Sequence, residues 1–203
     1  DVSFLPALLR RRLDRHGRMA LHTAWSCLEG IPSVQFVFAS RHGDLDRTLE
    51  LLTGLASQET LSPTVFSLSV HNSAAGLLSI ARGDRGAATA MSAGPDTLGM
   101  GLLEGASLIA EGAERVLVCY ADDAVPAAFQ PYVAEHSAYQ PFSISLLLTP
   151  PADAALQCRL VRETAAPAQA PEAALMHFLV EETAAEVIGV DQPWRLERGT
   201  DAA

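Results

Sequence analysis

Four segments between Ser62 and Asp122 decide the fold: SPTVFSLSVHNSAAG (62–76), GDRG (83–86), AATAMSAGPD (87–96) and VLVCY (116–120). The last is a continuously apolar run, which is typical of a strand covered on both faces. Residues 87–93 form a second expected strand, after which Pro95 and Asp96 suit the first turn of a helix to Ala110. Strands that alternate with helices predict an α/β fold with a largely parallel sheet between two helical layers.

The flanking sequence extends this pattern in both directions. Further helices are expected at 5–28, at 44–56 behind an Asp44 N-cap, and at 72–82. Further strands are expected at 33–39, 142–148 and 156–160. The last two alternate apolar and polar side chains, which predicts a half-exposed antiparallel pair at the sheet edge. The sheet is therefore expected to be mixed, mostly parallel and five-stranded.

The chain is expected to divide near residue 163. Residues 1–163 have enough apolar content for one core of ordinary size, since the whole chain has only 203 residues. The stretch 164–174 (TAAPAQAPEAA) is typical of an Ala/Pro linker. An acidic helix at 175–188 and a tail are expected to follow.

Charge and composition exclude several functions. All fourteen basic residues are arginine, so no lysine is present to form a Schiff base or a P-loop. The net charge of −10 argues against nucleic-acid binding. No apolar run approaches the length of a membrane span, and the arginines follow the short apolar segment 5–9 instead of preceding it as in a signal peptide. We expect a cytoplasmic protein.

Cysteine usage agrees with that compartment. Cys27, Cys119 and Cys158 are an odd number at distant spacings, without a C-x-x-C pair. We expect reduced thiols, and we expect neither a metal site nor a cofactor. Asp122-Asp123 could bind a cation, but two adjacent carboxylates without further ligands indicate a turn.

The order and spacing of the quoted segments resemble the first half of a β-ketoacyl synthase of the thiolase superfamily. Asn72–Gly76 is similar to the Asn-x-x-Ala-Gly helix of that family, and Gly83–Gly86 to its Gly-x-x-Gly turn. Residues 9–28 and 38–43 also resemble the chain-length-factor group, particularly the truncated partners of aryl-polyene pathways. The resemblance covers about residues 5–162 and implies a thiolase-like half with three α-β-α layers.

The resemblance also implies that this chain lacks the enzyme's catalytic groups. Counted from Gly86, the position of the family's nucleophilic cysteine falls on Pro95, and neighbouring positions carry no cysteine. The second thiolase half, which supplies a histidine pair and a lysine, is expected to be absent, since His177 is the only histidine after residue 162. A subunit without its own activity is therefore expected.

The family's dimers imply a role for the strand before Pro95. In thiolase-type dimers this strand pairs antiparallel with its mate, and here it carries mostly small side chains: Ala87, Ala88, Thr89, Ala90, Met91, Ser92 and Ala93. The expected partner is a full-length β-ketoacyl synthase in a heterodimer that elongates acyl chains, with acyl carrier protein involved only indirectly. Residues expected near the acyl tunnel are Met91, Gly94, Asp96, His71 and Asn72.

Two alternatives remain open at this point. Ala90–Gly94 is an A-x-S-x-G variant of a nucleophile elbow, so Ser92 could serve a small serine hydrolase with Asp122 or Asp123 and His136. The chain could also bind acyl groups as a homodimer. An arginine stripe at Arg11, Arg15 and Arg18 is either a solvated face or a patch that contacts a carrier protein or partner.

Overall fold

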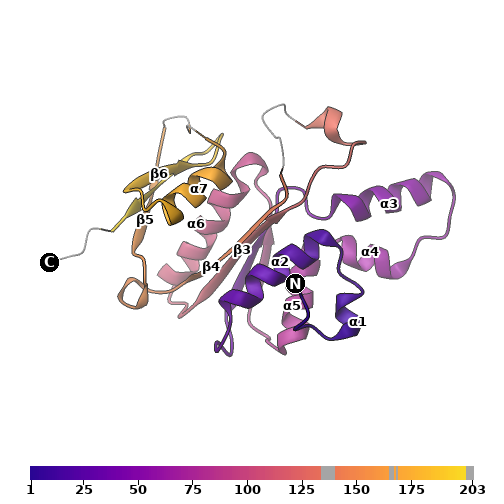
Figure 1. Ribbon diagram of the computed structural model, residues 1–203, viewed down its shortest axis with the longest axis horizontal. Coiled ribbons are helices and arrows are strands. Elements are labelled where there is room, and N and C mark those ends of the chain that lie inside the picture. The colour runs from indigo at the N-terminus through magenta and orange to yellow at the C-terminus, as the bar shows by residue number, and fades with distance from the viewer. Residues whose placement is uncertain (134–139, 165–166, 168, 200–203) are drawn as a thin grey trace.

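The protein is described by a computed structural model over residues 1–133, 140–164, 167 and 169–199. Figure 1 shows a central sheet with helices on both faces. The sheet has four strands in the order β2-β1-β3-β4. They are β1 (Gln35–Ala39), β2 (Ala88–Met91), β3 (Val116–Asp122) and β4 (Phe142–Leu148). β1 runs parallel to β2 and β3, whereas β4 is antiparallel to β3, which confirms a mixed and mostly parallel sheet.

Side chains of the central strands alternate between two apolar cores. Phe36 and Phe38 of β1 belong to one core, and Val37 belongs to the other. Every residue of β3 is buried, because Leu117 and Cys119 face the first core while neighbouring residues face the second. The continuously apolar sequence of β3 is thereby explained, as a strand between two helical layers needs apolar groups on both sides.

Helices cover both faces of the main sheet, as the sequence predicts, but the second layer also includes a helix that was expected in the tail. The first layer contains α2 (Arg15–Cys27) and α5 (Ser73–Arg82), and the second contains α6 (Thr97–Ala110) and α7 (Pro171–Val180). A Cβ atom on Gly101 would lie 2.9 Å from the Ala39 Cβ, and one on Gly105 would lie 2.5 Å from a Val118 methyl group. The two glycines therefore let α6 approach the sheet closely.

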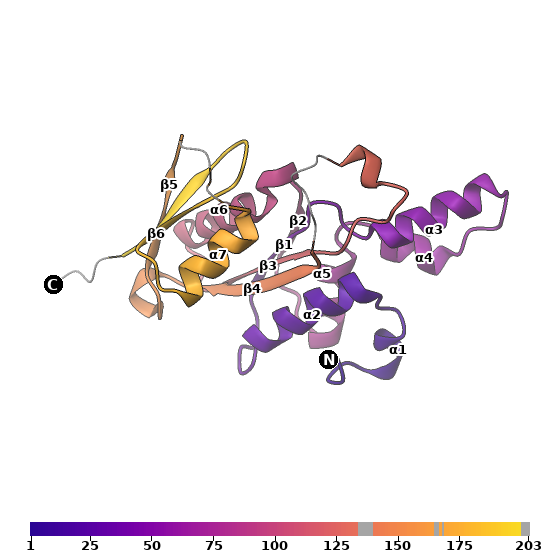
Figure 2. The same ribbon diagram turned by 45° about the horizontal axis from the view of Figure 1, so that its top comes forward.

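Two helices project away from the sheet at the end opposite α7 (Figure 2). They are α3 (Leu45–Ala56) and α4 (Pro63–Ser69). Asp44 caps α3 by accepting a hydrogen bond from the Arg47 amide at 3.0 Å, as predicted, and Ser62 caps α4. α3 has no buried residue, and large apolar side chains are exposed on this arm at Leu52, Leu55, Phe66 and Val70.

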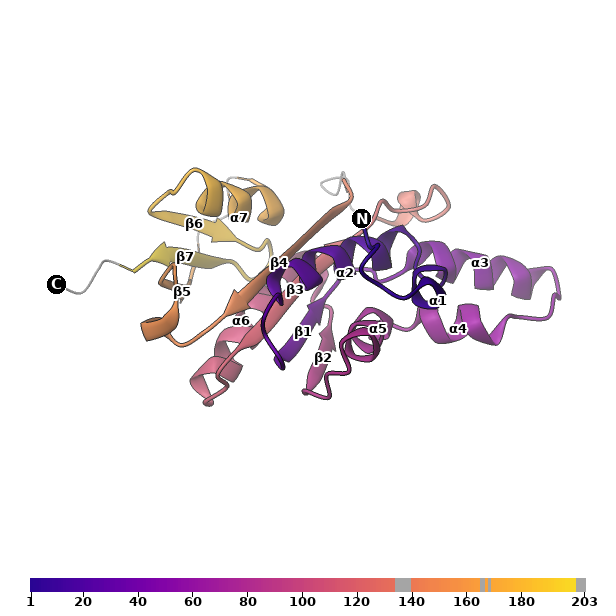
Figure 3. The same ribbon diagram turned by 60° about the horizontal axis from the view of Figure 1, so that its bottom comes forward.

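A second, antiparallel sheet lies beside α6 and α7 (Figure 3). It has the order β5-β7-β6 and consists of β5 (Cys158–Arg162), β6 (Ala185–Ile188) and β7 (Trp194–Arg198). β5 pairs with β7 and not with β4, so the prediction of a fifth strand in the main sheet was wrong. The same alternating pattern suits either sheet, and only distant residues decide between them. The pairing of β5 with β7 also joins residues on both sides of the domain boundary that was expected at residue 163.

Two predicted helices have different bounds in the structure. The expected helix at 175–188 is α7 followed by β6, because the chain turns at Glu182, where φ is +53°. The expected helix at 5–28 is divided into α1 (Ala7–Arg10) and α2. The division falls at Asp14, whose side chain accepts a hydrogen bond from the Gly17 amide at 2.8 Å and so starts a new helix.

Short 3₁₀ turns complete the described chain at Gly94–Asp96, Gln130–Tyr132 and Pro151–Asp153. Within the described residues, no helix combines the length and the apolar character that crossing a membrane would require. The loop after β3 contains residues 134–139, and the expected linker contains residues 165, 166 and 168, all of which lie outside the described residues.

Candidate functional site

The carboxyl ends of the three parallel strands meet at one edge of the main sheet. β1 ends at Ala39, β2 at Met91 and β3 at Asp122. The Ser40 amide donates to the Met91 carbonyl at 3.2 Å, and the Ser92 hydroxyl donates to the Arg41 carbonyl at 2.9 Å. The loops that follow the strands are therefore held together where ligands gather in α/β proteins.

Asp122 organises the loop after β1. Its side chain is buried, with 2% of the residue exposed, and accepts hydrogen bonds from the Ser40 hydroxyl at 2.8 Å and the Arg41 amide at 3.0 Å. The His42 amide donates to the same carboxylate at 3.3 Å. Three donors from one loop make Asp122 a structural anchor. The sequence suggested a turn, or an acid of the hydrolase alternative, and could not indicate this contact because the loop that Asp122 holds lies some eighty residues earlier.

Asp123 is used differently from its neighbour. Its carboxylate pairs with the Arg15 guanidinium, with 2.7 Å between Nε and Oδ2. Among the described residues, no group of three or more His, Cys, Asp or Glu side chains is arranged to hold a metal ion. The two adjacent aspartates thus bind separate protein groups.

Of the two residues expected near the acyl tunnel at the start of α5, His71 contacts the loop after β1 and Asn72 faces solvent. His71 Nε2 donates to the Ser40 carbonyl at 2.8 Å, and its ring lies 5.8 Å from that of Phe38. Asn72 is exposed at the start of α5, and its side chain makes no capping hydrogen bond. His71 therefore connects the start of α5 to the loop after β1.

Pro95, where the family resemblance predicts the nucleophile position, lies in the turn between β2 and α6. Gly94 has φ of +57°, and Pro95 is in the first turn of a 3₁₀ segment that continues as α6. Thr97 closes the turn, because its hydroxyl accepts from the Ala93 amide at 2.9 Å and donates to the Gly94 carbonyl at 2.7 Å. Proline offers no nucleophilic atom at this position.

Asp96, the next residue, is only 4% exposed. Its carboxylate accepts hydrogen bonds from the backbone amides of Val190, Asp191 and Gln192, in the loop between β6 and β7. The acid therefore points toward the C-terminal sheet. Sequence reasoning placed Asp96 near a tunnel and missed these three donors, because their approach depends on the fold of a segment expected to be a helix and tail.

The three cysteines lie away from this turn. Cys119 is buried on β3, where burial raises the pKa of its thiol to about 11. Desolvation by neighbouring groups also raises the pKa of Cys27, which is half-buried, and of Cys158, although the surface of Cys158 on β5 is exposed. A nucleophilic cysteine needs a lowered pKa, so these thiols do not have the character of a catalytic group.

The alternative nucleophile Ser92 has no histidine partner within the described part of the chain. Its exposed hydroxyl donates to the Arg41 carbonyl, and the carboxylate of Asp122 is occupied by backbone and hydroxyl donors. His136, the histidine of the hydrolase hypothesis, lies outside the described residues. Within the described residues, Ser92 therefore has a structural hydrogen bond and no adjacent general base to activate its hydroxyl.

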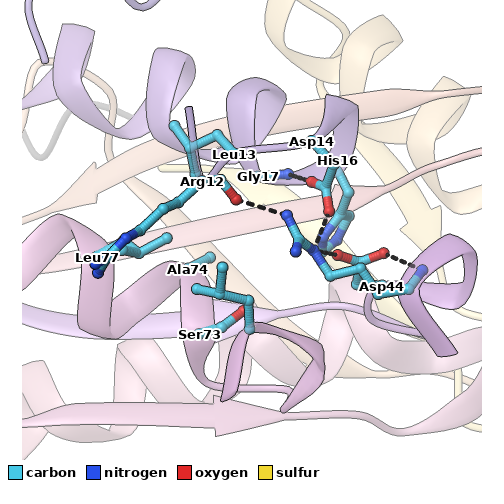
Figure 4. A pocket seen from close by; sticks show the side chains of 11 residues that line it. Arg12, Leu13, Asp14, His16, Gly17, Asp44, Ser73, Ala74 and Leu77 are labelled. Carbon is cyan, nitrogen blue, oxygen red and sulfur yellow. Dashed lines mark hydrogen bonds and ion pairs between the residues drawn. The ribbon is translucent and has the colours of Figure 1, made fainter. Parts of the chain in front are cut away.

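A charged cluster closes a small hollow between α2, α3 and α5 (Figure 4). Arg47 lies between two acids, with 2.6 Å from its Nε to Asp14 Oδ2 and 2.7 Å to Asp44 Oδ2. One guanidinium thus pairs with two carboxylates, of which Asp44 is buried and Asp14 is partly exposed. Burial and a hydrogen bond with Asp14 raise the pKa of Asp44 to about 7, whereas hydrogen bonds and the nearby Arg47 hold the pKa of Asp14 below its usual range.

The expected partner strand is at the edge of the main sheet. Among the described strands, only β1 pairs with β2. Phe36 and Ser40 of the β1 segment donate to the carbonyls of Ala87 and Met91, so residues 87, 89 and 91 direct their backbone polar groups toward β1. Because these groups alternate along a strand, those of Ala88 and Ala90 point outward.

Comparisons with known proteins identify the family. A family model described as "Beta-ketoacyl synthase, N-terminal domain" matches residues 1–195. One chain of a ketosynthase (ApeO) in complex with its chain length factor (ApeC) from Xenorhabdus doucetiae is similar, with 31% identity and a TM-score of 0.83. The match covers 96% of this chain and 82% of that one. No curated protein sequence matches.

Two further structures share the fold at lower identity. The ishigamide ketosynthase/chain length factor has 18% identity and a TM-score of 0.61, over 76% of this chain and 51% of that chain. A β-ketoacyl synthase from Burkholderia phymatum STM815 has 15% identity and a TM-score of 0.55, over 64% and 35%. The strand order, the helical layers and these matches agree on a thiolase-like fold, and the chain belongs to the β-ketoacyl synthase N-terminal domain family.

Proposed function

We propose that this chain is a non-catalytic, chain-length-factor-type subunit that pairs with a full-length β-ketoacyl synthase during fatty-acid or polyene-type acyl elongation. The observation that carries the proposal is the open edge of β2 immediately before a turn that has proline at the nucleophile position. The partner supplies the reacting cysteine and meets the acyl carrier protein. This chain supplies a wall of the space into which the acyl chain grows.

The character of β2 supports pairing through its backbone. Ala88 and Thr89 are exposed, and four alanines among residues 87–93 leave room for another strand. The outward amides of Ala88 and Ala90 would otherwise remain an unpaired sheet edge, which folded proteins usually cover or protect. In the Xenorhabdus complex a ketosynthase and a chain length factor are found together, which supports a partner of the same kind for this chain.

The proposed contact places Met91 and Gly94 beside the partner's acyl chain. Met91 is half-buried against the α6 core at the end of β2, and Gly94 begins the next turn. His71 lies near the carboxyl ends of the parallel strands, where it donates a hydrogen bond to the Ser40 carbonyl. The flexible side chain of Met91 is suited to an apolar wall whose size limits product length.

Strand pairing can be tested without breaking the subunit's own sheet. Ala88→Pro removes an outward amide and leaves the ladder with β1 in place, because residues 87, 89 and 91 make that ladder. Ala185→Pro is the matched control, since Ala185 is an exposed alanine on β6, an edge strand of the second sheet. After co-expression with the ketosynthase, size-exclusion chromatography with light scattering should show the pair for wild type and for the control only.

The outcomes separate the proposal from its alternatives. Loss of the pair in Ala88→Pro, with unchanged circular dichroism, supports pairing through β2. An intact pair in Ala88→Pro contradicts this interface. A wild-type chain that elutes with a second copy of itself, and not with the ketosynthase, would instead support a homodimeric acyl-binding protein.

A further inference from the structure

The buried carboxylate of Asp96 connects two distant parts of the chain. Val190, Asp191 and Gln192 direct successive backbone amides at it, with N···O distances of 3.1 Å for Asp191 and 2.9 Å for Gln192. Successive amides that converge on one point form an anion-binding nest. The nest in the β6–β7 loop is therefore occupied by an anion from the same chain, about 95 residues earlier.

The loop has the backbone shape that a nest requires. Gly189 precedes the three donors with φ of +100°, in the region that favours glycine. A Cβ atom at this position would lie 2.9 Å from Asp96 Oδ1 and 3.0 Å from the Gln192 carbonyl oxygen. The loop thus closes around the carboxylate and has no space for a side chain at Gly189.

Apolar contacts place the same loop over the first turn of α6. A Cβ atom on Gly99 would lie 3.6 Å from Ile188 and 3.9 Å from Trp194, the residues that flank the loop in β6 and β7. Ile188 is fully buried. The β6–β7 hairpin therefore covers the start of α6, directly behind the turn that contains Pro95.

We propose that Asp96 is a positioning residue, whose charge in the 190–192 nest sets the shape of the Gly94–Thr97 turn and so the size of the acyl space beside it. The inference rests on the proposed function, because the turn borders that space only in a pair with the ketosynthase. Since Asp96 is adjacent to Pro95, a shift of its Cα on losing the nest would move the turn directly. Thr97 closes the turn from the other side through its hydroxyl. Without the contacts of Asp96, Thr97 would not be sufficient to keep the turn in its present shape.

The first experiment tests the nest on the wild-type full chain and its variants. Asp96→Ala removes the carboxylate, and its melting temperature should fall by roughly 5–10 °C, as expected for the loss of charge-assisted hydrogen bonds in a chain of this size. Sodium formate replaces the missing group in size and charge, so it should restore part of that loss, whereas sodium chloride at equal ionic strength should not. Asp191→Asn, which removes an exposed carboxylate from the same loop, should melt like wild type in every salt.

Asp96→Asn keeps the size of the side chain and serves if Asp96→Ala does not fold. It loses the charge and one acceptor oxygen, so it should melt at an intermediate temperature. A melting temperature of Asp96→Asn equal to wild type would overturn the role of the charge. A formate effect that is the same in wild type, Asp191→Asn and Asp96→Ala would overturn the nest.

The second experiment reads the product profile of the reconstituted pair. Asp96→Asn should still elute with the ketosynthase but broaden or shift the product lengths by at least one elongation round, while Asp191→Asn leaves them unchanged. An unchanged profile from an intact Asp96→Asn pair overturns the positioning role. Failure of the wild-type chain to pair refutes the proposed function instead, and the melting experiment still decides whether Asp96 fills the nest.

Discussion

In the wild-type chain the free energy of unfolding should fall as the pH rises toward 8, and replacing Asp44 by asparagine should remove this fall. Asp44 is 8% exposed and shares Arg47 with Asp14, so its carboxyl group keeps a proton up to a pH of about 7. A pKa that is raised in the folded state gives stability that is present at low pH and lost as the pH rises through the folded value. Asparagine remains neutral and can still cap α3 with its side-chain oxygen.

The size of the effect follows from the two pKa values of Asp44. With 3.8 in the unfolded chain and about 7 in the folded one, raising the pH from about 5 to about 8 should lower the free energy of unfolding by roughly 2 kcal/mol. Asp14 acts in a different window, because its pKa is lowered and its contribution is lost only on acidification below about pH 4. Burial lowers the pKa of His42, whose contribution therefore rises with pH and is common to both variants.

The assay is urea unfolding of wild type and Asp44→Asn at both pH values, followed by circular dichroism. Between the two pH values, the free energy of unfolding should fall by roughly 2 kcal/mol more for the wild-type chain than for Asp44→Asn, through a change of midpoint and not of slope. Asp46→Asn, which changes an exposed acid in the first turn of the same helix, should keep the wild-type pH dependence. Equal pH dependence in wild type and Asp44→Asn would refute the idea that Asp44 stays protonated near neutral pH because it shares Arg47 with Asp14.

Other predictions concern packing and the proposed acyl wall. Gly105→Ala should destabilise the chain by about 1–3 kcal/mol in urea unfolding, because the new methyl group would lie 2.5 Å from a Val118 carbon. Gly76→Ala, which has open space around it, should be neutral or stabilising. Equal effects of the two substitutions would contradict the close packing of α6. Met91→Ala should lengthen the products of a reconstituted pair and Met91→Trp should shorten them, and identical chromatographic profiles would remove Met91 from the acyl wall. Ala90→Trp should weaken pairing by adding bulk beside the β2 edge, which an unchanged elution volume would contradict.

The main sheet and its helices could be predicted because their signals are local. The apolar run of β3 requires cover on both faces, and Asp44 caps the helix that it precedes. The order of these elements is sufficient to indicate the family. Each of these features depends on residues that are near one another in the sequence.

The C-terminal region was predicted poorly because its structure depends on distant partners. Residues 185–188 and 194–198 are short segments that become strands by pairing with each other and with β5. The three amides that hold Asp96 come from the same region, so the sequence could not assign that acid its contacts. Asp122 was underestimated for a similar reason, as its donors follow β1 and not β3.

The division of labour between two subunits can be measured directly by intact-mass spectrometry. The chain is co-purified with its ketosynthase, incubated with acyl-carrier substrate and resolved by subunit. The account predicts that the two proteins elute together, that the acyl adduct appears on the ketosynthase alone, and that this chain keeps its unmodified mass. An acyl adduct on this chain, above all on Ser92, or acyl transfer by this chain without the ketosynthase, would contradict the account.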